Sequence, residues 1–276
     1  MKSLVVVGVH DYGFFDRCLA AIKLRAAKMR VDVTCEIVTA DDDISTIQNR
    51  PVSPGTAFFF FGPRFASAAK ALHARGLHVV VMGTPPLDED PGIPIVHGDH
   101  EKGGYLAARH LIELGHRRIA YANYYPDVTP NHPRWLGFQR AAYEERLRAG
   151  RVSGSFIEQS RVEAWIGDPS SARSFLMTEE APTGIAAWND FEAVRLLTVF
   201  NQAGISVPGD VSLLGYDALP QAELCDPPLT TIDAGIDEQV DAALYLLDHP
   251  SYEVDSSYVV AVPSLIRRGS TGPPRS

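Results

Sequence analysis

Several features that mark common protein classes are missing from this sequence. Its three cysteines, Cys18, Cys35 and Cys225, are scattered over 276 residues without paired spacing, which argues against a disulfide framework and against a zinc site. No apolar run approaches the roughly 20 residues that a membrane-spanning helix needs. The opening MKSLVVVGVHDYG has too short an apolar run for a signal peptide. We therefore expect a cytoplasmic protein with reduced thiols and no membrane partner.

Positive charge and catalytic motifs are also scarce. Lys and Arg total 25 against 34 Asp and Glu, and a net charge of −9 argues against direct binding to nucleic acid phosphates. The sequence has no P-loop, GxGxxG, GxSxG or HExxH motif, and no persuasive pairing of a nucleophile with a base. Histidines near predicted loop ends lack metal-ligand spacing. We expect neither an enzyme nor a metal or organic cofactor. These histidines are His10, His97, His100 and His132.

What the sequence does contain is an alternation of strand and helix patterns, clearest between residues 182 and 217. The apolar run 184–188 predicts a strand buried on both faces. Asn189 and Asp190 are good N-cap residues, so a helix should begin there, and Gly204 should end it. Residues 211–214 predict a second buried strand. Such a strand-helix-strand unit has parallel strands and a right-handed connection.

The carboxyl ends of these two strands predict a ligand site. Ligands of parallel α/β sheets bind in the crevice outside the carboxyl ends of the strands. Asn189 follows the first strand and Asp217 ends the second. We expect their polar side chains to face the same crevice.

The same alternation continues through the chain, so the predicted class is α/β with parallel sheets in two lobes. Residues 4–8 read as a strand and residues 14–29 as a helix. The run 57–61 holds four consecutive phenylalanines and predicts a central strand covered on both faces. Short linkers favour a cleft between the lobes. The polar segment 269–276 is expected to be disordered.

Several segments resemble the effector-binding core of the lactose-repressor (LacI/GalR) family of bacterial transcription regulators. They occur in the family's order and with similar spacing from about residue 99 to residue 271, whereas the first 98 residues match in pattern but hardly in motif. The segments are DHEKGG at 99–104, ARHLIELGHRRIA at 108–120, RWLGF at 134–138, PTGI at 182–185, ND at 189–190, VPGDVS at 207–212, GYD at 215–217, PPLTTI at 227–232 and PSLIRRGST at 263–271.

The resemblance implies a type I periplasmic-binding-protein-like fold, with two doubly wound parallel-sheet lobes joined by three crossovers. The first lobe is expected to hold 1–117 plus 233–262, and the second 118–232 plus 263–271, followed by a tail at 272–276. The family's regulators read operator DNA through an N-terminal helix-turn-helix. This chain shows none, so that domain is expected either to have been removed or to be naturally absent.

By the resemblance, a small-molecule effector binds in the cleft between the lobes, and the core forms a homodimer. Arg134, Asn189 and Asp217 would bind the effector from the second lobe. The first loop would supply a ring-stacking wall from Tyr12, Phe14 and Phe15. We expect Arg134→Ala to weaken effector binding by an order of magnitude or more without much change in melting temperature.

Two tryptophans could complete this site. Trp165, in a predicted loop, could form an aromatic platform for a sugar face. Trp188 stands where the family usually has a small residue and could shrink the pocket. Ala234 and Lys102 also depart from sugar-binding members, which puts a plain lactose-type pocket in doubt.

Each of these assignments has a structural alternative. Arg134 can be a surface residue at a helix end, Asn189 a helix cap and Asp217 a loop carboxylate. Asp190 fits best as a structural cap. Phe15 and Trp188 can be core residues.

The predicted function is an effector-sensing and dimerisation domain of a LacI-type regulator, which binds a sugar or derivative to modulate DNA binding. One alternative is a stand-alone or transport-type sugar-binding protein of the same fold, which would require export. An enzyme on a doubly wound fold is a further alternative, disfavoured by the missing catalytic residues.

Overall fold

The computed structural model describes residues 1–8, 13–38, 45–49, 51–62, 65–83, 92–123, 132–249 and 258–275. Residues 1–98 and 235–262 form unit 1, and residues 99–234 and 263–276 form unit 2. The chain therefore passes from one unit to the other three times. None of the helices in the described ranges combines the length and the hydropathy of a bilayer-spanning segment.

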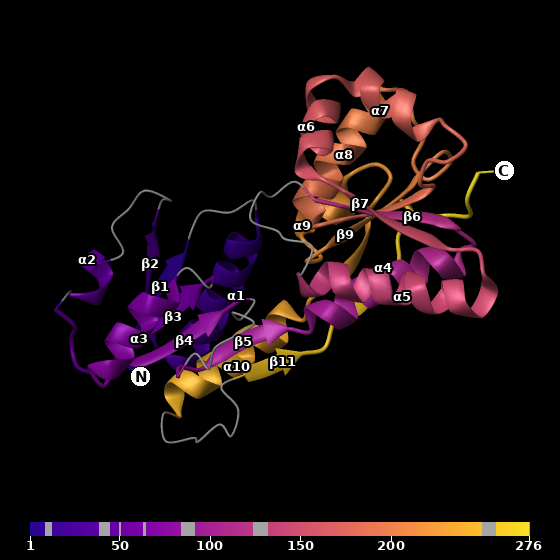
Figure 1. The fold of residues 1–276 in the computed structure, drawn as a ribbon. Coiled ribbons are helices and arrows are strands. Elements are labelled where there is room, and N and C mark those ends of the chain that lie inside the picture. The colour runs from indigo at the N-terminus through magenta and orange to yellow at the C-terminus, as the bar shows by residue number, and fades with distance from the viewer. Residues whose placement is uncertain are drawn as a thin grey trace. The chain divides into compact units, whose positions relative to one another are not determined.

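Unit 1 is an α/β unit around one six-stranded sheet (Figure 1). The strand order is β11-β5-β4-β3-β1-β2, and every pair is parallel. Its elements are β1 (Ser3–Gly8), α1 (Phe14–Met29), β2 (Asp32–Ile37), α2 (Ser45–Gln48), β3 (Thr56–Phe61), α3 (Ala66–Ala74), β4 (His78–Met82), β5 (Ile95–Gly98), α10 (Ile236–Asp248) and β11 (Tyr258–Ala261).

The four phenylalanines of β3 confirm the prediction of a central strand covered on both faces. Because side chains alternate along a strand, Phe58 stacks with Phe60 at 6.0 Å, and Phe59 with Phe61 at 4.9 Å. The first pair joins a core cluster with the residues of α3, and the second pair meets α1 through Phe15.

Unit 2 holds the second six-stranded sheet, with the order β12-β10-β9-β8-β6-β7. Its pairs are parallel except for β12, which runs antiparallel to β10. Its elements are α4 (His100–Glu113), β6 (Arg118–Ala122), α5 (Pro133–Ala149), β7 (Ser153–Ile157), α6 (Gln159–Gly167), α7 (Pro169–Leu176), β8 (Gly184–Ala187), α8 (Asp190–Gln202), β9 (Ser212–Tyr216), α9 (Pro220–Leu224), β10 (Thr230–Asp233) and β12 (Ser264–Ile266).

The first boundary between the units differs from the expected one. Residues 99–117, placed in the first lobe by the resemblance, belong to unit 2 because α4 packs closely on α5. Glycines make this contact possible: a Cβ on Gly104 would lie 1.8 Å from the Arg134 carbonyl oxygen, and one on Gly137 would lie 1.8 Å from the Glu101 carbonyl oxygen. The second boundary between the units also differs from the expected one: it lies between residues 234 and 235, not between residues 232 and 233.

The expectation of a disordered C-terminal segment is wrong for residues 269–275. The Ser270 hydroxyl is fully buried, donates to the Leu213 carbonyl at 2.5 Å and accepts from the Thr230 amide at 2.9 Å. The backbone N–H of Gly272 donates to Ser212 at 3.0 Å, and Arg275 donates to the Leu176 carbonyl at 2.6 Å. This segment is thus held along the edge of unit 2 where β9 and β10 begin.

Two buried histidines help to hold this C-terminal segment. The His116 ring bonds Thr183 through Nδ1 at 2.9 Å and the Gly272 carbonyl through Nε2 at 2.9 Å. His110 Nε2 lies 2.9 Å from the Thr271 hydroxyl, and burial, helped by Arg267, lowers the pKa of His110 to about 4. Both rings are therefore neutral hydrogen-bonding groups near neutral pH.

Candidate functional site

The candidate site is built at the start of α5, where Arg134 is the second helical residue. Pro133 occupies the first helical position, which suits a residue without an N–H. His132 is the N-cap, and its Nδ1 accepts from the Arg134 backbone N–H at 3.2 Å. This local sequence fixes the direction in which the Arg134 side chain leaves the helix.

The glycine contact between α4 and α5 brings a second histidine to Arg134. The first residue of α4 is His100, and Arg134 Nε donates to its Nδ1 at 3.3 Å. A Cβ on Gly103 would lie 2.2 Å from the Tyr216 hydroxyl oxygen, so only glycine lets α4 approach the end of β9 this closely. The two helices and β9 therefore meet at one point of unit 2.

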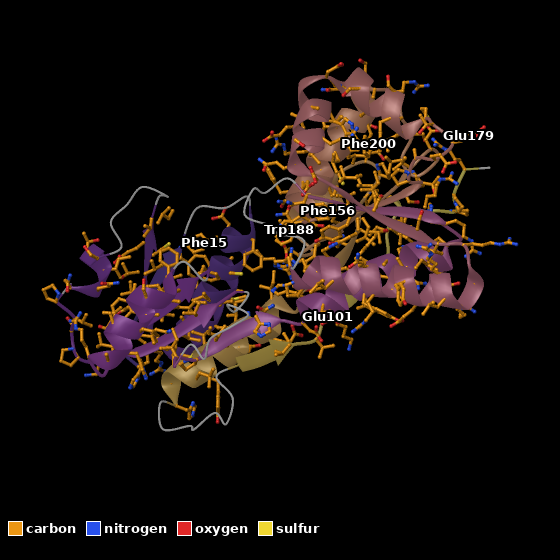
Figure 2. The ribbon with its side chains drawn as sticks, viewed as in Figure 1. Phe15, Glu101, Phe156, Glu179, Trp188 and Phe200 are labelled. Carbon is orange, nitrogen blue, oxygen red and sulfur yellow. The ribbon has the colours of Figure 1, made fainter. Side chains whose placement is uncertain are left out.

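Arg134 contacts residues at the carboxyl ends of two neighbouring strands, β8 and β9. Its Nη1 donates to the Trp188 carbonyl at 2.8 Å, and its Nη2 lies 3.5 Å from a carboxylate oxygen of Asp217. The guanidinium also lies over two rings, 3.8 Å from the Tyr216 centroid and 4.7 Å from that of Trp188. We call His100, His132, Arg134, Trp188, Tyr216 and Asp217 the Arg134 cluster; Trp188 is labelled in Figure 2.

Burial makes the charges of this cluster strongly interdependent. Arg134 and Asp217 are 7% and 3% exposed, so each charge depends on the other for compensation. Asp217 also has a backbone φ of 91°, in the left-handed region that few non-glycine residues adopt. Strained residues of this kind concentrate at binding sites, which supports a functional role for Asp217.

His132 and Tyr216 of the cluster are uncharged near neutral pH. Burial, reinforced by the charge of Arg134, lowers the pKa of His132 to about 3. A neutral His132 agrees with its role as hydrogen-bond acceptor for the Arg134 amide. Burial also raises the pKa of the Tyr216 hydroxyl, which stays protonated. His132 packs against Trp188 with ring centroids 4.4 Å apart, forming an aromatic wall beside the guanidinium.

Asn189 and Asp190 have structural roles at the start of α8. The Asn189 side chain accepts from the Glu192 amide at 2.8 Å, which is the N-cap alternative. Asp190 is fully buried and accepts from the Leu219 amide and from the Thr231 hydroxyl, both at 2.6 Å. Burial raises the pKa of Asp190 to about 7. These bonds fix the segment that follows β9 and carries Asp217.

Trp165 does not form the expected platform. It lies in helix α6, not in a loop, and is 1% exposed. Its ring packs 5.6 Å from Phe175 and 6.2 Å from Phe200, within the hydrophobic core of unit 2. The pattern of Val162, Trp165 and Ile166 has helical spacing and could have indicated this helix.

The aromatic residues of the first loop have separate outcomes. Tyr12 lies outside the described residues. Phe14 is half-buried at the first residue of α1. Phe15 is 1% exposed and packs edge-on against Phe61 with ring centroids 5.1 Å apart, while its ring fills the space beside Gly8. Phe15 thus follows the core-packing alternative.

Sequence reasoning missed three members of the cluster. His100 and His132 were considered only as possible metal ligands, and Tyr216 only as part of a family motif. The position of His132 directly before a helix-starting proline was a signal for an N-cap. Nothing in a single sequence showed that the glycines of α4 and α5 would bring His100 to Arg134.

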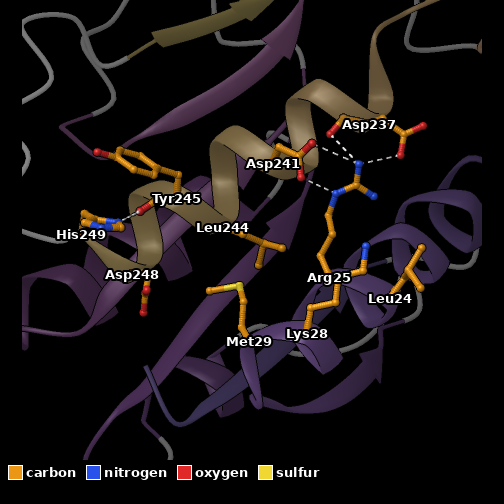
Figure 3. Close-up of a pocket in the computed structure, with 10 residues that line it drawn as sticks. All are labelled: Leu24, Arg25, Lys28, Met29, Asp237, Asp241, Leu244, Tyr245, Asp248 and His249. Atoms are coloured by element: carbon orange, nitrogen blue, oxygen red, sulfur yellow. Dashed lines mark hydrogen bonds and ion pairs between the residues drawn. The ribbon is translucent and has the colours of Figure 1, made fainter.

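Unit 1 has a separate hollow of about 590 Å³ between α1 and α10 (Figure 3). Its charged groups largely satisfy one another: Arg25 pairs with Asp241 and, at 2.9 Å, with Asp237. Tyr245 and His249 stack at 4.2 Å along the same helix. The hollow contains none of the residues expected from the sequence, so the Arg134 cluster remains the better candidate site.

Comparison with known proteins identifies the family. A model of the periplasmic binding protein-like domain matches residues 108–271. The HTH-type transcriptional repressor PurR of Photobacterium profundum is 33% identical over 159 residues, 56% of this chain and 45% of the repressor. The chain spans about half the length of the curated relatives it matches. These relatives are named as transcriptional repressors.

Solved structures show the same architecture over the whole chain. A LacI transcriptional regulator from a Rhodococcus species superposes with a TM-score of 0.80 at 25% identity, covering 100% of both chains. A LacI family regulator from Enterococcus faecalis with bound ribose gives a TM-score of 0.76 at 25% identity, covering 99% of both. Both the predicted fold and the predicted resemblance are confirmed. The chain belongs to the periplasmic binding protein-like family and has the architecture of the effector-binding core of LacI-type transcriptional regulators.

Proposed function

We propose that this chain senses a small metabolite, a sugar or sugar derivative, which binds at the Arg134 cluster. The observation that carries the proposal is the buried pair of Arg134 and Asp217 at the carboxyl ends of β8 and β9, in which the guanidinium also lies over two aromatic rings. The ribose-bound regulator of the same architecture supports a sugar as the ligand class.

The chemistry of the cluster suits a polyhydroxylated ring. A guanidinium donates and a carboxylate accepts, so neighbouring hydroxyls of a sugar can bond to both members of the pair. The half-buried Trp188 offers a flat apolar face against which the C–H face of a sugar can pack. Asn189 contributes less than expected, because its side-chain oxygen already caps α8.

Regulation would follow because effector binding and the conformation of the core are thermodynamically linked. An effector that binds one conformation of the core better than another shifts the balance between them. In a homodimer that carries DNA-binding domains, such a shift would change their spacing and so the affinity for operator DNA. We infer that the chain acts in this way in the cytoplasm.

A thermal-shift screen tests the proposal directly. The purified chain is heated with sugars, sugar phosphates, polyols or nucleobases, and a ligand that binds only the folded state raises the melting temperature. The proposal requires a hit among the sugars or their derivatives. Hits confined to nucleobases, or no hits in the screen, would contradict a sugar effector.

Calorimetry with the best ligand then locates the site. Asp217→Asn keeps the size of the side chain but removes its charge, and it should weaken binding at least tenfold. Asp168→Asn is the matched control, because Asp168 is an exposed N-cap of α7 and asparagine caps helices equally well. Equal affinities for both variants would exclude the Arg134 cluster as the binding site.

A further inference from the structure

Strand β7 leaves one edge of the unit 2 sheet open. It is the last strand in the sheet order, and within the part of the chain that the structure describes it pairs with β6 alone, in parallel register. Ser153 donates its N–H to Arg117, and Ile157 accepts from Asn123, so these two residues direct their backbone groups toward β6. Because this direction alternates along a strand, Gly154 and Phe156 direct theirs toward the open edge.

This edge lacks the features that usually prevent strand addition. Proteins normally protect an open edge with charged side chains, prolines or bulges. Ser153, Gly154 and Ser155 are all exposed, and β7 contains neither a proline nor a charged residue. The edge strand β2 of unit 1 differs, because it carries Asp32 and Glu36. The backbone of β7 is therefore accessible to another strand.

A hollow lies on each side of this edge, next to one of the outward-directed residues. On the face covered by α5, a hollow of about 170 Å³ adjoins Gly154 and is lined by Tyr143 and Arg146. On the face covered by α6, a hollow of about 460 Å³ adjoins Phe156 and is lined by Glu158 and Arg161. Helices α5 and α6 lie on opposite faces of the sheet (Figure 1).

The two hollows match the geometry of an added strand. Side chains of a strand point alternately to its two faces, so two side chains an odd number of positions apart on an incoming strand would point to opposite faces, one toward each hollow. Extended peptides that bind in this way gain affinity from main-chain hydrogen bonds and specificity from alternate side-chain pockets.

The charges around the edge indicate what such a strand would carry. Among the residues that line the two hollows, the charged ones are the exposed Arg146 and Arg161 and the carboxylate of Glu158. Arg161 lies over the Phe175 ring at 4.6 Å instead of pairing with Glu158. An occupant with carboxylates would therefore meet complementary charge.

We propose that β7 binds an extended, acidic segment of a partner protein as an additional parallel or antiparallel strand. The segment donates to and accepts from the backbones of Gly154 and Phe156. It places acidic or polar side chains in the hollows beside Arg146 and Arg161. This surface is separate from the Arg134 cluster and does not depend on the proposed effector.

Selection from a random library of 12-residue peptides displayed on phage tests the proposal. The selected peptides are synthesised, and their affinity for the full chain is measured by fluorescence polarisation at low and high salt. We expect peptides rich in Asp and Glu, with affinity that falls as salt rises. Hydrogen exchange should show slower exchange of the Gly154 and Phe156 amides when peptide is bound.

Two variants distinguish strand addition from other binding. Gly154→Pro removes an outward N–H without removing a bond to β6, and it should weaken binding at least tenfold. Gly154→Ala keeps the N–H and is the matched control; its Cβ would lie 3.1 Å from that of Ala142, a contact that a small shift relieves. Arg146→Glu, which leaves the backbone intact, should also weaken binding of acidic peptides.

Several results would overturn the proposal. These are a selection without acidic peptides, binding that is equal in the Gly154→Pro and Gly154→Ala variants, and unchanged exchange at Gly154 and Phe156. A self-association by sedimentation that Gly154→Pro abolishes would show a second copy of the chain as the occupant instead. If Gly154→Pro does not fold, Arg146→Glu and N-methylated versions of the selected peptides decide the matter, because strand addition requires loss of binding in both.

Discussion

The carbonyl oxygen of Arg134 fills the place that a side chain on Gly104 would occupy, since an ideal Cβ there would lie 1.8 Å away. The α4–α5 contact and the candidate site therefore depend on each other. The same helix crossing that lets His100 reach Arg134 leaves no room for a methyl group.

Gly104→Ala should consequently destabilise unit 2. Overpacking a tight contact costs typically about 1–3 kcal/mol and occasionally more, and here the clash is with backbone, so we expect at least about 3 kcal/mol. Urea denaturation measures the change. Gly167→Ala is the matched control, because nothing lies within 4 Å of its Cβ, and it should be neutral or slightly stabilising. Equal stabilities of the two variants would contradict the close crossing.

Arg134→Ala should lower stability as well as effector affinity, in contrast to the expectation from the sequence. Its removal leaves the Asp217 carboxylate, 3% exposed, without its ion pair. Breaking a buried pair in this way costs about 3–5 kcal/mol. The free energy of unfolding should fall by that amount in urea. A double variant with Asp217→Asn should recover part of the loss, and no recovery would mean that the pair is not coupled.

Asp190→Asn should change how stability depends on pH. The folded protein raises the pKa of Asp190 from 3.8 to about 7, so it binds this proton more tightly than the unfolded chain does. That contribution to stability is complete below about pH 4 and is lost as pH rises through about 7. At about 1.4 kcal/mol per pKa unit, wild type should lose a few kcal/mol relative to Asp190→Asn between about pH 5 and pH 8.

Denaturation of both proteins at the two pH values checks this prediction. Asparagine can accept from the Leu219 amide and donate to Thr231, so the variant should fold. Asp168→Asn should differ from wild type by the same amount at both pH values. A pH-independent difference for Asp190→Asn would show that Asp190 is ionised throughout this range.

Ser270→Ala should destabilise unit 2 by about 1–3 kcal/mol, because it leaves the Thr230 amide and the Leu213 carbonyl without a buried partner. Thermal unfolding measures the loss. Ser264→Ala, at an exposed position of β12, is the control and should stay within about 0.5 kcal/mol of wild type. If Ser270→Ala unfolded at the same temperature as wild type, the C-terminal segment would not be an integral part of the unit.

The sequence predicted the features that depend on local pattern. The period of residues 182–217 predicted β8, α8 and β9, and with them the position of Asn189 and Asp217 after two neighbouring strands. It could not predict features that depend on distant partners. The segment 269–275 is polar and rich in small residues, like a disordered tail, but bonds to distant buried partners such as His116 and Ser212 order it. Trp165 was misplaced because α6 starts without a side-chain cap.

The phenylalanines of β3 also affect how the chain behaves before it has folded. Phe58 to Phe61 are buried only when α1 and α3 cover the two faces of a parallel sheet, whose strands are distant in sequence. Parallel sheets form slowly, and an exposed apolar strand of this kind promotes aggregation. A newly synthesised chain therefore exposes an aggregation-prone segment until the sheet of unit 1 has formed. Its yield in cells should depend on chaperones that bind such segments.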